Sequence, residues 1–214
     1  MMAGTLTMPV NTVTDYARRL KEAGLLSTAP RGSPAPDMTP MDAARLVLAV
    51  LSSDQAAQCV ERVRRFGPIP YSPGFRKIYR WYETIQPEEF HQIFEGETFE
   101  DVLASIFAIP ERQGILKACE WFDRNVFHLR VSPFEVLGEL FSWRWEGREV
   151  IAERVVPFKG KVWADMVEGE PRQRVEGFTP ITGGVRTERS FGGSQFLSVG
   201  ISLMTEAKGG RDDE

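Results

Sequence analysis

The sequence predicts an α+β fold in which a helical N-terminal part precedes a smaller C-terminal part that contains β-strands. Apolar residues recur at helical spacing through much of the chain up to Phe122. Beyond Val126 the pattern changes, and Glu146-Gly147 separates two strand-like segments as a hairpin turn would. The 214 residues, 42% hydrophobic and 26% charged, are enough for one large domain or two small ones with a substantial core.

The first expected element is an amphipathic helix that starts near Asn11 and closes at Gly24. At roughly 100° per residue, one narrow apolar stripe must face a core: Val13, Ala17, Leu20 and Gly24. The opposite side and its flanks are polar: Asn11, Thr14, Asp15, Arg18, Arg19 and Glu22. Asn11 or Thr12 can cap the helix start, and a glycine commonly ends a helix. Leu25 and Leu26 are then expected to turn back onto the core.

Prolines and a glycine interrupt the pattern over residues 27–37, so this segment is expected to be a loop with Arg31-Gly32 at its tip. Thr39-Pro40-Met41-Asp42 then has the signature of a helix start, with Thr39 as the cap and Pro40 in the first turn. The following helix, 41–51, is apolar nearly all round and should be buried.

A second buried helix is expected to follow, capped by Ser53 or Asp54, with its arginines outside. Its apolar positions are Val60, Val63 and Phe66. Gly67-Pro68-Ile69-Pro70 ends this unit and predicts a domain boundary. The predicted domains are therefore residues 1–67 and 72–206.

The C-terminal part is expected to begin with helices and to continue with strands. The expected helices are 88–94, 99–108 and 115–122. The expected strands are 134–145 and 148–156, which form the hairpin, and 162–167. Residues 177–193 are rich in Gly, Thr and Ser and are expected to be mostly loop. The pattern of 195–204 fits a strand or a helix, and 207–214 should be frayed.

Residues 9–40 resemble winged helix-turn-helix DNA-binding proteins. The resemblance is carried by Pro9-Val10-Asn11-Thr12-Val13, Arg18-Arg19-Leu20 and Ala23-Gly24-Leu25-Leu26. It implies that the first helix is the recognition helix and that the loop with Arg31 takes the place of the wing. Such domains place two helices before the recognition helix, whereas about ten residues precede this one. We therefore expect a truncated domain with an upstream start codon. Alternatively, the helices at 41–66 or a second subunit cover the apolar stripe.

The chain is also similar, more loosely, to uncharacterised proteins from phages and prophages of proteobacteria. This likeness rests on the Ala-Gly-Leu-Leu turn, the Arg-Gly loop and residues 38–46, and extends weakly to 186–192. It implies DNA binding and transcriptional control in a mobile element. It implies no catalytic residue.

The leading functional prediction is a sequence-specific regulator that binds double-stranded DNA. The residues expected to face the groove are Thr12, Thr14, Asp15, Arg18 and Arg19, while Lys21 and Arg31 would contact the backbone. Residues 1–80 carry 11 Lys and Arg against 6 Asp and Glu, although the whole chain has a net charge of −4. A basic N-terminal part suits an approach to phosphates. The C-terminal part would make a homo-oligomer, such as a dimer, or sense a signal.

No enzyme, metal or cofactor site is predicted, because no motif brings suitable ligands together. His91 and His128 are isolated, and no Walker loop or nucleophile elbow is present. Cys59 and Cys119 form no C-x-x-C pair, which fits a reducing cytoplasm. No apolar run approaches the roughly 20 residues that span a bilayer, and no secretory signal is seen.

The alternative is a phage assembly or scaffold protein that uses the first helix for protein–protein contact. The aromatic segment 141–145 would then be an interface, since Trp and Arg are favoured there, or else part of a packed β core. Residues 75–82 interleave bases with aromatics. They fit either nucleic-acid stacking or a core helix with a solvated basic face.

Overall fold

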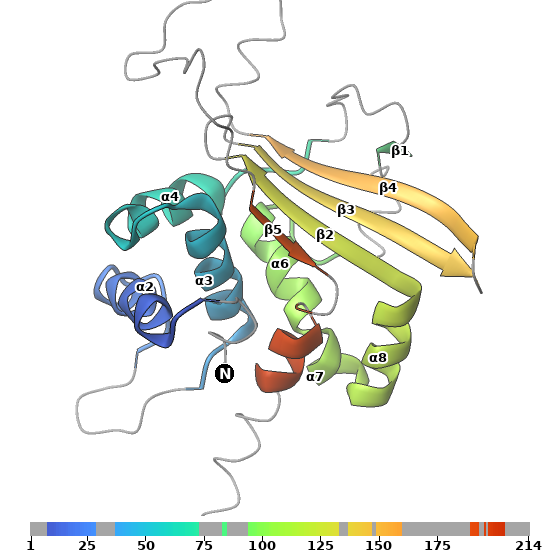
Figure 1. Cartoon of the computed structure of the whole chain (residues 1–214), viewed down its shortest axis with the longest axis horizontal. Coiled ribbons are helices and arrows are strands. Elements are labelled where there is room, and N and C mark those ends of the chain that lie inside the picture. Colours follow the sequence, from blue (N-terminus) through green and yellow to red (C-terminus); the bar gives the residue numbers. More distant parts are fainter. Residues whose placement is uncertain are drawn as a thin grey trace, which may run out of the picture.

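Figure 1 shows a computed structural model of the chain, which has an α+β fold with helices gathered on one side of a five-stranded sheet. The structure describes residues 8–28, 37–72, 83–84, 94–132, 137–146, 149–159, 189–192, 195 and 197–203. Two predicted segments, 75–82 and 162–167, lie outside these ranges, and so does nearly all of the predicted helix 88–94.

The described residues of the N-terminal part form three helices and a short 3-10 turn: α2 (Val10–Glu22), α3 (Pro40–Ser52), η1 (Ala56–Gln58) and α4 (Cys59–Phe66). Helix α3 is buried along most of its length, and both α2 and α4 pack against it. This confirms the two helices predicted over 41–51 and through Val60, Val63 and Phe66. It also places α3 between the other two helices and the sheet (Figure 1).

The predicted cap of α3 is confirmed, whereas those of the other two helices are wrong. Thr39 and Asp42 form a reciprocal capping box at the start of α3. Helix α2 starts two or three residues earlier than a cap at Asn11 or Thr12 would require, because the Pro9 carbonyl already accepts the N–H groups of Thr12 and Val13. Ser53 ends α3, and the 3-10 turn η1 leads into α4 with no side-chain cap.

The remaining helices are α6 (Phe99–Phe107), α7 (Ile109–Gln113) and α8 (Ile115–Arg124). Helices α6 and α8 confirm the predictions over 99–108 and 115–122. The ambiguous segment 195–204 is helical over 197–203. Gly200 of this segment lies close to Pro110 of α7. A Cβ at position 200 would come within 2.7 Å of the proline ring, so the contact with α7 requires a glycine there.

The strands are β1 (Glu83–Thr84), β2 (Asn125–Ser132), β3 (Leu137–Glu146), β4 (Glu149–Lys159) and β5 (Arg189–Gly192). Their order across the sheet is β1-β4-β3-β2-β5, antiparallel except for the β1–β4 pair. The β3–β4 hairpin is confirmed, with a register shift between Arg144 and Trp145. The expectation of a loop at 177–193 is wrong for 189–192, because β5 hydrogen-bonds to the edge of β2.

One hydrophobic core runs through both parts of the chain, from Val13 on α2 to Leu203 near the C-terminus. Backbone hydrogen bonds cross the point of the predicted boundary: Glu100 N–H donates to the carbonyl of Gly67, and Phe99 N–H to that of Ile69. The division into two domains stays a prediction, and the described residues pack continuously across it.

An aromatic contact between helix α6 and the sheet depends on a glycine. The ring of Phe99 stacks on Phe158 of β4, with centroids 4.6 Å apart. A Cβ at Gly138 of β3 would come within 2.3 Å of the Phe99 ring. Because Phe99 and Phe158 are both fully buried, the ring has no free space into which it can move.

We therefore expect Gly138→Ala to lower the free energy of unfolding by about 1–3 kcal/mol through overpacking. Urea unfolding followed by far-UV circular dichroism measures the change. An unchanged unfolding midpoint would show that α6 is not held against the sheet at this point.

Candidate nucleic-acid interface

The apolar stripe of α2 is covered by other helices of the same chain. Val13, Tyr16 and Leu20 are buried, and they face α3, η1 and α4. Of the three explanations considered for the stripe, coverage by the helices at 41–66 is confirmed. Leu26 is buried as well, which confirms that the chain turns back onto the core after α2.

Tyr16 is the member of this stripe that sequence reasoning missed. It lies three positions after Val13 and therefore on nearly the same side of the helix. Its ring is 2% exposed, and its hydroxyl donates to the Ser53 carbonyl at 3.2 Å. The hydroxyl thereby ties α2 to the end of α3, which a purely apolar residue could not do.

The predicted DNA-contacting residues of α2 are on its outer side, to different degrees. Thr14, Arg18 and Lys21 are exposed, whereas Thr12 and Asp15 are half-buried. The Thr14 hydroxyl donates to the Val10 carbonyl within the helix, at 2.9 Å. The side chain that the sequence assigns to the wing, Arg31, lies outside the described residues.

Two guanidinium groups on this face are bound by carboxylates of the same helix. Arg18 pairs with Asp15 at 2.7 Å and with Glu22 at 2.6 Å, and Arg19 donates to Asp15 at 3.2 Å. The hydrogen bond from Arg18, together with that from Arg19, holds the pKa of Asp15 below its ordinary value. In return, Asp15 and then Glu22 raise the pKa of Arg18. The two positive and two negative charges cancel on the outer face of α2.

The C-terminus of α2 is fixed by a motif that requires a glycine. Gly24 has a φ of 71°, its N–H donates to the Lys21 carbonyl, and Leu25 N–H reaches back to the Leu20 carbonyl. This pair of hydrogen bonds is the Schellman arrangement. The prediction that Gly24 closes the helix is therefore confirmed in its geometry.

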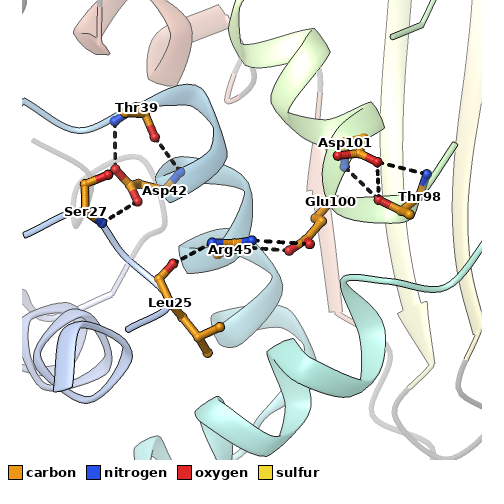
Figure 2. A network of polar contacts seen from close by, with 8 residues as sticks. All are labelled: Leu25, Ser27, Thr39, Asp42, Arg45, Thr98, Glu100 and Asp101. Carbon is orange, nitrogen blue, oxygen red and sulfur yellow. Dashed lines mark hydrogen bonds and ion pairs between the residues drawn. The ribbon is translucent and has the colours of Figure 1, made fainter. Parts of the chain in front are cut away.

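A polar network then holds the chain that leaves α2 (Figure 2). Arg45 of α3 donates to the Leu25 carbonyl at 3.0 Å and to the Glu100 carboxylate of α6 at 2.9 Å. Asp42 accepts from the Ser27 N–H at 2.8 Å and from the Thr39 N–H at 3.0 Å. These contacts fix the position of α2 relative to the body of the protein.

Helix α4 runs beside α2 and brings further arginines to it. Arg64 Nη2 lies 3.5 Å from the Ala23 carbonyl at the end of α2. At the other end of α4, burial raises the pKa of the Cys59 thiol, and the charge of nearby Arg19 opposes this only in part. Cys59 is fully buried, so it has the environment of an inert core residue.

Among the residues that the structure describes, no group of three or more His, Cys, Asp or Glu side chains could hold a metal ion. Within the same residues, no helix has the length and apolar character needed to cross a membrane. His91 lies outside the described ranges, and His128 is in β2. Comparison with protein-family models, curated proteins and solved structures finds no match to this chain.

We expect Arg45→Met to lower the free energy of unfolding by about 1–3 kcal/mol, because it leaves a partly buried carboxylate and the Leu25 carbonyl without their donor. Urea unfolding at neutral pH measures the loss. The matched control is Arg65→Met, which removes an exposed contact 3.9 Å from Glu61 and should change stability by less than about 0.5 kcal/mol. Equal effects of the two variants would contradict a central role for Arg45.

Asp42 should contribute stability that is lost in acid. Burial alone would raise the pKa of this carboxyl, but the hydrogen bonds from Thr39 and Ser27 together outweigh burial and lower the pKa below 3.8. A lowered folded-state pKa stabilises the fold above the unfolded value, and this contribution disappears as the pH falls below about 4. The stability difference between wild type and Asp42→Asn should therefore shrink in that range. Urea unfolding across a pH series tests this, and a difference that is independent of pH would refute it.

Proposed function

We propose that this protein is a sequence-specific regulator that binds double-stranded DNA through helix α2. The observation that supports it is the division of α2 into a buried stripe, held by α3, η1 and α4, and a polar outer face. In this proposal Thr12, Thr14, Asp15, Arg18 and Arg19 face the major groove, while Lys21 and Arg31 contact the DNA backbone.

The dimensions of α2 suit such a role. Its 13 residues give a length of about 20 Å. A helix about 10–12 Å across fits the major groove, which is about 12 Å wide. Arg18 and Arg19 carry the planar donor groups that recognise guanine, and Asp15 can accept from cytosine. Since their ion pairs are exposed, base edges can replace the carboxylates at little cost.

The proposal extends to the rest of the chain. The helical N-terminal part would act as a winged helix-turn-helix of the kind found in phage and prophage regulators. The β-containing part would form a homodimer or sense a signal in the cytoplasm, because paired half-sites are the usual way to reach adequate affinity.

A second candidate is a phage assembly or scaffold protein, and two exposed apolar side chains favour it. Val10 at the start of α2 is 67% exposed, and Leu116 on α8 is 81% exposed. A helix with an exposed apolar residue and a charge-neutral face also suits protein–protein contact.

The test is binding of the purified protein to labelled duplex DNA from the region upstream of its gene, followed by fluorescence anisotropy. We expect Arg18→Ala combined with Arg19→Ala to weaken binding to the preferred sequence about tenfold or more, because each guanine contact contributes about 1–3 kcal/mol. Alanine favours helix, so α2 should keep its structure. The matched control is Lys117→Ala, which removes an exposed cation from α8.

Unchanged affinity in the double variant would refute groove reading by α2. Absence of salt-sensitive binding to any duplex, combined with sedimentation as a stable higher oligomer, would instead favour the assembly protein.

A further inference from the structure

This inference rests on the proposed function and concerns the source of the attraction for DNA phosphates. Phosphate contacts supply most of the non-specific affinity of a DNA-binding protein. The outer face of α2 is a poor source, because Asp15 and Glu22 cancel the charges of Arg18 and Arg19. Attraction to the backbone must therefore come from neighbouring cations.

Helix α4 carries an excess of positive charge. Its arginines are Arg62, Arg64 and Arg65, and its one carboxylate is Glu61. Glu61 lies 3.8 Å from Arg62 and 3.9 Å from Arg65, so it pairs only loosely with Arg65. Arg64 contacts the neutral carbonyl of Ala23, which leaves its charge uncompensated there.

One of these charges, that of Arg64, lies next to the end of α2, and Arg65 follows it on α4. Arg64 reaches the cap residue of α2, two positions beyond Lys21, and the two helices lie side by side in Figure 1. Lys21 and Arg64 are exposed, and the Arg65 side chain is 37% exposed. Lys21 has no ion-pair partner among the described residues. We call these three residues the α2–α4 seam.

We propose that the α2–α4 seam binds the phosphate backbone of the duplex whose groove α2 enters. Packed helices lie about 8–10 Å apart, so a helix beside one in the major groove is placed over a flanking strand. Arg64 and Arg65 are thus positioning contacts that carry no sequence information, in contrast to Arg18 and Arg19.

The experiment measures the dependence of duplex affinity on salt concentration for wild type and for Arg64→Ala combined with Arg65→Ala. Loss of two phosphate contacts should lower the slope of log K against log salt by about 1.8. Affinity for the preferred duplex and for a random duplex should fall by the same factor, about tenfold or more at low salt. The matched control is Arg112→Ala, because Arg112 is also 37% exposed but lies on α7 beside Glu95. Melting temperatures and circular dichroism establish that each variant is folded.

Two results would overturn the inference in different ways. In the first, the variant of Arg18 and Arg19 loses sequence preference, whereas the variant of Arg64 and Arg65 keeps the wild-type slope of log K against log salt. This result would mean that α2 binds DNA without a phosphate contact from the seam. If wild type binds no duplex even at low salt, the proposed function fails and the seam proposal fails with it. Arg64→Glu separates charge from packing: it should weaken binding more than Arg64→Ala, and an equal effect would contradict a phosphate contact.

Discussion

The contacts of Arg45 join three parts of the chain at one point. Its guanidinium group extends from α3 to the carboxylate of Glu100 on α6 and to the carbonyl of Leu25 after α2. A charge that is 27% exposed needs such partners, because desolvation without compensation is costly. The same helix holds Ser27 through Asp42, so the chain that leaves α2 is fixed at two residues, Leu25 and Ser27 (Figure 2). The orientation of α2 is therefore determined by polar contacts as well as by its apolar stripe.

The character of α3 explains why α2 and α4 each expose a polar face. Helix α3 is apolar nearly all round, and both the sheet-side elements and the outer helices pack on it. Helices α2 and α4 each bury one side on α3, and both are amphipathic, so their outer faces carry the charged residues of this region. Because α2 and α4 both pack on this buried helix, two polar faces lie next to each other. On α2 the charges of Asp15, Arg18, Arg19 and Glu22 cancel, whereas α4 carries more arginines than carboxylates.

The parts of the fold that sequence predicted are those that local chemistry determines. Thr39-Pro40-Met41-Asp42 specifies a helix start through its own hydrogen bonds, and Glu146-Gly147 separates two strands that pair with each other. Strand β5 was missed because its four residues pair with β2, some sixty positions earlier in the chain, in a segment otherwise rich in glycine. Of the predicted stripe of α2, Val13 and Leu20 are buried and Ala17 is half-buried, whereas Gly24 is exposed, so the prediction that it faces the core is wrong. Tyr16 was missed, because its burial depends on an acceptor at the end of α3.

For the candidate site, the sequence indicated which residues of α2 face outward but not what they contact. The spacing of Asp15, Arg18 and Glu22 permits ion pairs, and the structure shows that both carboxylates of this set are used. The contact of Arg64 with α2 joins residues 41 positions apart, so no local pattern could reveal it.

If α2 reads DNA as proposed, the ion pairs on its outer face would have a physical consequence for selectivity. Phosphates attract a basic helix on any sequence, so strong charge on a reading face raises binding to wrong sites as much as to the right one. On α2, a guanidinium group would exchange its exposed ion pair with Asp15 or Glu22 for contacts with a base. A guanine edge offers two acceptors in the plane of the guanidinium group, whereas a mismatched base offers fewer. The carboxylates would then compete, by the modest energy of an exposed ion pair, with bases that offer poor contacts, while the seam would supply an attraction common to all sequences. In this proposal, separation of the two tasks on adjacent helices allows specificity to increase without loss of general affinity for DNA.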